Sequence, residues 1–207
     1  MRRFLICSAL LATWLMPAQM LSAQADDAKP DAFAQQMFHS APGKDKSYAC
    51  FVRTYDPGHL VRHPLQKVKA MKLLVTGETD PETHKFGYSF RMGVTFRNRS
   101  GTFDSSGDCG IGGITESPAH RSVMGCSVDC DGGGISVEMT PDNKSTLVRL
   151  DRIRIWQNNK PDDEGLDMSG GADDRVFRLD RAKLDMCGSL VTDRKELAAM
   201  RTLKKEQ

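Results

Sequence analysis

The fold is decided by residues 85–97, which have the sequence KFGYSFRMGVTFR. From Phe86 to Phe96 every second side chain is apolar, and polar residues or glycine occupy the positions between them. Because successive side chains of a strand point to opposite faces, this alternation predicts a long strand with one buried face. Gly87 and Gly93 fall on the polar face, where glycine allows a long strand to coil.

Similar segments recur along the chain, with turn residues between them. Residues 140–144 (TPDNK) and 131–134 (DGGG) have the composition of tight hairpin turns. The apolar positions change parity within residues 147–156, which predicts a bulge or bend near Asp151. The predicted strands are residues 47–55, 67–76, 85–97, 111–115, 121–130, 134–140, 145–156, 175–180 and 183–191.

A helix is predicted on each side of these strands. Pro30 precedes apolar residues at helical spacing, and Asp193 is placed to cap a C-terminal helix with Glu196 three residues later. We therefore expect a mainly β fold: a single antiparallel barrel or sandwich of about eight or nine strands, with a short N-terminal helix and a capped C-terminal helix.

The N-terminus has the pattern of a secretory signal peptide. Arg2 and Arg3 precede an apolar run, and Ala23-Gln24-Ala25 fits a small-x-small cleavage site. The apolar run is too short to span a membrane. We expect residues 1–25 to be a signal peptide, 26–46 a flexible segment and short helix, and 47–207 a single β-rich domain with a C-terminal helix. The expected location is periplasmic or secreted, in a bacterium.

Net charge argues against one class of partner. The formal charge is +2, and Arg2 and Arg3 account for all of that excess. Nucleic-acid binding needs surplus Lys and Arg, so no nucleic-acid partner is expected. Residues 53–72 are rich in basic side chains, whereas residues 161–174 carry acids and no base. This separation predicts a dipolar surface whose basic stretch contacts an anionic partner.

Export also changes how the cysteines are interpreted, because disulfides persist in oxidising compartments. One of the six cysteines, Cys7, lies in the predicted signal peptide, so an odd number remains. Several pairings are possible. Cys126 and Cys130 would lie about 13 Å apart in a strand, beyond the roughly 7 Å that a disulfide spans, so each is expected to bond elsewhere. The expected disulfides are Cys109–Cys126, across neighbouring strands, and Cys130–Cys187, with Cys50 left as an inert buried thiol.

His59 and His63 are the histidines most suited to a site. Their i, i+4 spacing places two imidazoles on one helix face, as zinc sites require. However, Leu60 stands where a metalloprotease carries its general base, and Pro64 disfavours helical geometry at His63. A structured turn is the simpler interpretation. His59, Arg62 and His63 are the candidate ligand or partner contacts, and neither a metal nor a cofactor is expected.

The apolar stripe of residues 86–96 has two interpretations, since a small closed barrel either fills with side chains or holds one apolar ligand. A barrel followed by a helix resembles the lipocalin plan in architecture. The Gly-x-Trp motif of that family is missing, because Trp156, the one tryptophan beyond the signal peptide, falls late in the chain. Residues 157–174 have no periodicity, and loops of that length are either functional or mobile.

No catalytic set of residues is assembled by these motifs. The leading hypothesis is an exported periplasmic, non-enzymatic β-domain with an envelope-associated binding or structural role. Its partner would be an envelope protein, an anionic envelope component or a small apolar ligand. One alternative is a metal-dependent hydrolase that uses His59 and His63, and another is a secreted inhibitor or effector.

Overall fold

The computed structural model describes residues 30–43, 45–113, 122–157 and 164–203, so the predicted signal peptide lies outside the described part. The elements in chain order are α1 (Pro30–Phe38), β1 (Ser47–Thr54), α2 (Pro57–Arg62), β2 (Val68–Thr79), β3 (Phe86–Phe96), β4 (Phe103–Gly113), β5 (Ser122–Ser127), β6 (Gly133–Met139), β7 (Ser145–Gln157), β8 (Leu166–Ser169), β9 (Val176–Ala182), the 3₁₀ helix η1 (Leu184–Leu190) and α3 (Arg194–Leu203).

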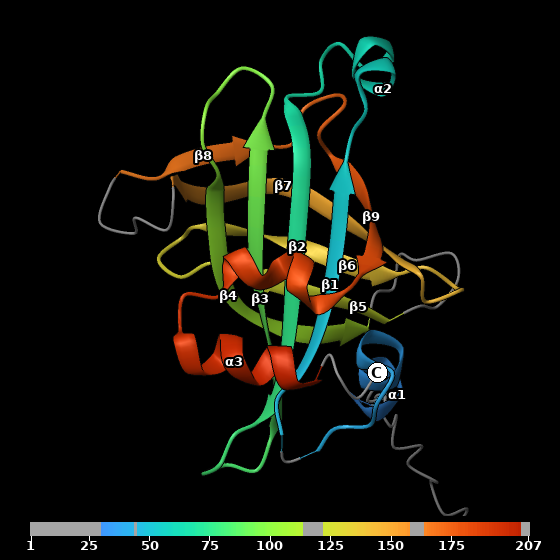
Figure 1. Cartoon of the computed structure of the whole chain (residues 1–207), viewed down its shortest axis with the longest axis vertical. Coiled ribbons are helices and arrows are strands. Elements are labelled where there is room, and N and C mark those ends of the chain that lie inside the picture. Colours follow the sequence, from blue (N-terminus) through green and yellow to red (C-terminus); the bar gives the residue numbers. More distant parts are fainter. Residues whose placement is uncertain (1–29, 44, 114–121, 158–163, 204–207) are drawn as a thin grey trace, which may run out of the picture.

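The described strands form one antiparallel sheet that closes in a ring (Figure 1). Its order is β6-β5-β4-β3-β2-β1-β9-β7, and β6 also pairs with β7. Of the strands that the structure describes, β8 joins β7 alone, at the end of this order. The mainly β fold with a helix near each end, expected from the sequence, is confirmed.

β3 shows how the ring is filled. The side chains of Tyr88, Phe90, Met92 and Val94 are buried on its inner face, as the alternation predicts. They belong to one core cluster with inward side chains of the other strands and with α1. The ring of Phe33 on α1 packs edge-on against that of Tyr88, with 5.7 Å between centroids. Side chains thus occupy the space that an apolar ligand would need.

A second core cluster lies on the outside of β1 and β2, beneath η1 and α3. The sequence predicted a strand at residues 183–191, and that prediction is wrong. Leu184, Cys187 and Leu190 are buried at a spacing of three, which matches the three residues per turn of a 3₁₀ helix. Gly93 makes room for this helix, since a Cβ there would lie 2.7 Å from Leu190 Cδ2.

Polar contacts fix α3 to the same face. Asp193 Oδ1 accepts a hydrogen bond of 2.7 Å from the backbone N–H of Glu196, which confirms the predicted cap. The Glu196 carboxylate accepts two hydrogen bonds of 3.0 Å from Arg91 on β3, and one of 3.4 Å from the Tyr48 hydroxyl on β1. Burial, with the Glu196 charge beside it, raises the pKa of Tyr48 to about 12.

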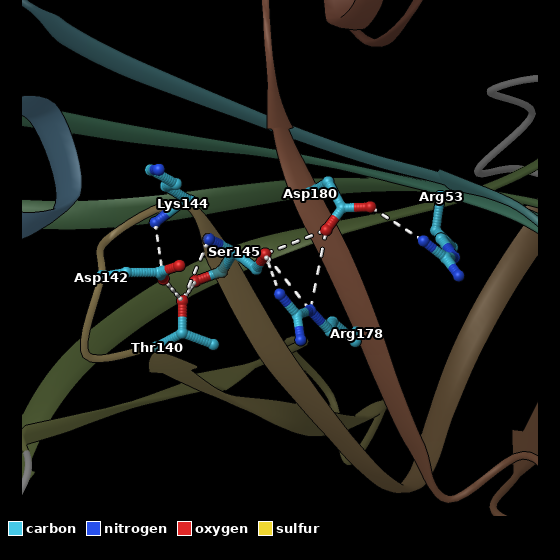
Figure 2. A network of polar contacts seen from close by, with 7 residues as sticks. All are labelled: Arg53, Thr140, Asp142, Lys144, Ser145, Arg178 and Asp180. Carbon is cyan, nitrogen blue, oxygen red and sulfur yellow. Dashed lines mark hydrogen bonds and ion pairs between the residues drawn. The ribbon is translucent and has the colours of Figure 1, made fainter.

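Asp180 on β9 links the side chains of the two neighbouring strands, β1 and β7 (Figure 2). Its carboxylate accepts a hydrogen bond of 2.9 Å from Arg53 on β1 and another of 2.9 Å from the buried Ser145 hydroxyl on β7. Arg178 donates to the same hydroxyl oxygen. The adjoining β6–β7 turn is held by Thr140, whose hydroxyl donates to Asp142. The network thus joins β1, β7 and β9 around the enclosed Ser145 side chain.

One predicted irregularity of the strands is confirmed, and two strands differ from expectation. The predicted bulge is confirmed: Gly134 pairs with Arg152 and Ile135 with Leu150, so Asp151 is the extra residue. β4 begins eight residues before the predicted strand, since its first half (FDSSGDCG) lacks apolar alternation but pairs with β3. β8 forms inside the predicted loop of residues 157–174.

The cysteines pair differently from the prediction in one of two cases. Cys109 and Cys126 face each other across β4 and β5 and form the expected disulfide. The pairing of Cys130 with Cys187 is wrong, and so is a free Cys50, because Cys187 bonds Cys50 with their Cα atoms 5.9 Å apart. Cys130 is an exposed thiol in the β5–β6 turn, whereas Cys187 faces β1 from the covering 3₁₀ helix.

Candidate functional site

α2 projects from one end of the ring, and β8 lies at the same end, which we call the mouth (Figure 1). The helix begins at Asp56, whose Oδ1 accepts a hydrogen bond of 2.8 Å from the His59 N–H, and Pro57 starts the first turn. That hydrogen bond lowers the pKa of the Asp56 carboxyl. The helix ends at His63, which has left helical geometry before Pro64.

The two candidate histidines lie face to face. The His59 and His63 rings are stacked with centroids 4.3 Å apart, and Tyr55 stacks on the other side of His59 at 4.6 Å. His59 Nε2 is 3.0 Å from the buried Gln66 Oε1, and His63 Nδ1 is 3.8 Å from Asp173. Ring nitrogens bind metals in the plane of the ring, so stacked faces do not direct both at one ion. Within the described residues, no group of three or more His, Cys, Asp or Glu is placed to hold a metal.

The acidic loop before β9 packs against the basic segment around α2. Asp173 accepts a hydrogen bond from the Leu65 N–H, and the buried Asp174 accepts from those of Lys67 and Val68. The described parts of the two oppositely charged stretches therefore meet at the mouth. The separate charged faces that the sequence predicted are absent from these parts, because long-range folding brings the stretches together.

A cleft of about 320 Å³ opens at the mouth. Its apolar lining comes from Phe96 at the end of β3, Ile155 on β7, and Leu166 and Met168 on β8. Its remaining lining is polar and consists of Lys67, Asn98, Arg99, Asp167, Ser169 and Asp174. The lining is therefore mixed, with four apolar and six polar or charged residues, and the volume is at the small end for binding sites.

Two large exposed apolar side chains lie in the segment of chain that leads to the cleft residue Lys67. Val61 on α2 is 76% exposed and Leu65, two residues before the cleft residue Lys67, is 63% exposed. Arg62, the third candidate contact, is exposed between Val61 and His63. We call Val61, Leu65 and the cleft the mouth surface.

Sequence reasoning found residues next to this surface but not the surface itself. It singled out His59, Arg62 and His63, which lie together. It missed Val61, Leu65 and the cleft, because exposure of an apolar side chain cannot be read from its identity. The alternation of Leu166 and Met168 in the sequence LDMS was the available signal for β8.

Comparison with known proteins adds no assignment: no protein-family model, curated protein or solved structure matches this chain. Among the helices in the described ranges, none is long and apolar enough to cross a membrane.

Proposed function

We propose that this chain is an exported, non-enzymatic binding domain with an envelope-associated role, and that it contacts an envelope protein through the mouth surface. The observation that carries the proposal is the grouping of exposed apolar side chains. Five large ones are exposed in the part of the chain that the structure describes, and Val61, Leu65 and Leu166 among them lie at the mouth. Exposed apolar groups at the same end of the ring as a cleft favour a macromolecular partner.

The filled interior supports a surface site over an internal one. The stripe of residues 86–96 packs with the other strands and α1 in one core, which favours the outer surface as the place where a partner binds. The charge pattern also weighs against a polymer that is anionic along its whole length, because Asp173 and Asp174 accompany the basic segment.

Export is supported by the cysteines. Two disulfides are formed among the described residues, and disulfides persist chiefly outside the reducing cytosol. The predicted signal peptide and the envelope-associated role remain part of the proposal.

Site-specific photo-crosslinking tests the proposed contact. A photoreactive phenylalanine analogue is placed at position 61 or 65, with position 186 as the matched control, because Met186 is a 50% exposed apolar residue on η1, away from the mouth. We expect discrete adducts with an envelope protein from positions 61 and 65 in the native host. Absence of adducts from both, or equal labelling from position 186, would overturn the proposal.

Metal analysis of the same purified chain tests the hydrolase alternative. Because the stacked His59 and His63 rings do not direct their nitrogens at one ion, we expect no stoichiometric zinc. Zinc at one equivalent that is lost on His59→Ala substitution would replace the binding-domain proposal with the metal-dependent one.

A further inference from the structure

β8 differs from the other described strands in its hydrogen bonding. Each ring strand has a neighbour on both sides, whereas among the described residues β8 pairs with β7 on one side only. A terminal strand presents a row of backbone N–H and C=O groups that can pair with another chain. β8 contains neither lysine nor proline, which often protect natural edge strands, although the strand is short and carries the charged Asp167.

The cleft lies along this strand. All four residues of β8 line it, together with Phe96 and Ile155. Side chains on one face of adjacent strands lie side by side, so a strand added to β8 would direct alternate side chains towards the apolar lining beside Leu166 and Met168. The edge and the cleft therefore fit one kind of occupant, an extended polypeptide.

The charges at the cleft favour an acidic occupant. Lys67 and Arg99 form no ion pair with any described residue, although both line the cleft. The acids of the cleft are already engaged: Asp167 pairs with Arg152 and Arg154, and Asp174 accepts backbone hydrogen bonds.

We propose that β8 is a docking edge: an extended segment of the partner protein adds to it as a further strand, with alternate apolar side chains in the cleft and an acidic side chain beside Lys67 and Arg99. This inference rests on the proposed function, since it names how a partner is held at the mouth. Backbone hydrogen bonds supply affinity in such strand addition, and the cleft and the two cations supply selectivity.

Selection from a random heptapeptide library, with the full mature chain as target, tests the docking edge. We expect enriched peptides to alternate apolar residues and to contain Asp or Glu. Their synthetic forms should lose affinity at least about tenfold when alternate backbone amides are N-methylated, because each methyl removes a hydrogen-bond donor. Amide hydrogen exchange in β8 should slow when the peptide binds.

Charge variants locate the peptide. Arg99→Glu should weaken binding about tenfold, and Lys67→Gln should weaken it less, because one reverses a charge and the other removes one. Lys85→Glu is the matched control, since Lys85 is an exposed cation in the β2–β3 turn, which lies at the far end of the ring from the mouth (Figure 1). Failure to enrich any peptide, binding that survives N-methylation, or equal effects of Arg99→Glu and Lys85→Glu would overturn the inference.

The two proposals fail in distinguishable ways. If positions 61 and 65 crosslink to a partner but no peptide protects β8, the mouth contact stands and the docking edge falls. If peptides bind β8 but positions 61 and 65 give no adduct, the proposed partner contact through Val61 and Leu65 falls.

Discussion

Two regions of the ring differ in whether their apolar side chains are covered. One is the face beneath η1 and α3, and the other is the mouth. On the covered face, the apolar side chains of the sheet meet Leu184, Leu190 and Met200 of the covering helices, and Arg91 meets Glu196. At the mouth, Val61 and Leu65 remain exposed. The covered face is packed against helices of the same chain, whereas the mouth is left exposed. Groups of the first kind should govern stability, and groups of the second kind should govern recognition.

The disulfide of the covered face should have the largest effect on stability. Cys50 and Cys187 are separated by 137 residues, whereas Cys109 and Cys126 are separated by 17. Loop-closure entropy predicts a loss of about 5 kcal/mol for Cys50→Ala with Cys187→Ala, and about 3 kcal/mol for Cys109→Ala with Cys126→Ala. Urea unfolding followed by Trp156 fluorescence measures both. An equal or larger loss from the shorter loop would show that loop length does not decide how much each disulfide stabilises the fold.

The next effect concerns the ion pair beneath α3. The Glu196 side chain is 12% exposed and receives two hydrogen bonds from Arg91. Arg91→Met leaves that carboxylate enclosed without its cation, so a loss of about 2 kcal/mol is expected. Arg154→Met is the control. Both side chains of the Arg154–Asp167 pair are exposed to solvent, so this pair should contribute less than about 0.5 kcal/mol. Urea midpoints that shift equally in the two variants would show that α3 is not held by this pair.

Tyr48 should make the covered face sensitive to alkaline pH. Its pKa is about 12 in the folded chain, above the ordinary value of 10.0. The folded state therefore holds the phenolic proton more tightly than the unfolded chain does. The resulting stability is complete below about pH 10 and is lost as the pH rises towards about 12.

Comparison with Tyr48→Phe isolates this effect from other groups that titrate in the same range. The free energy of unfolding of the wild type should fall more steeply than that of the variant between pH 10 and 12. Parallel profiles would mean that Tyr48 ionises as easily when folded as when unfolded.

The strands that were predicted well are those whose alternation is imposed by burial on one face. β3 is the clearest, since Phe90 and Met92 are fully enclosed and Arg91 faces the other way. The first half of β4 was not predicted, because it has few apolar side chains and is held by its pairing with β3. η1 was misassigned because a spacing of three over seven residues resembles a short apolar run when only a period of two is tested.

The candidate site was only partly predictable, because its properties arise from contacts between distant segments. The spacing of His59 and His63 is local and was recognised. The meeting of Asp174 with Lys67 spans 107 residues, and the bond between Cys187 and Cys50 spans 137. No local pattern encodes either contact. The charge balance of the mouth and the pairing of the cysteines therefore required the three-dimensional structure.

Substitutions at the mouth should have the smallest effect on stability, in contrast to those on the covered face. Val61→Ser and Leu65→Ser alter side chains that are 76% and 63% exposed, so the free energy of unfolding should change by less than about 0.5 kcal/mol. The same two substitutions should remove most of the crosslinking to the partner from a photoreactive group placed at the neighbouring Arg62. Met186→Ser on η1 should leave both measurements unchanged. A marked loss of stability from the mouth variants would mean that these side chains belong to the fold, and the mouth would then resemble the covered face.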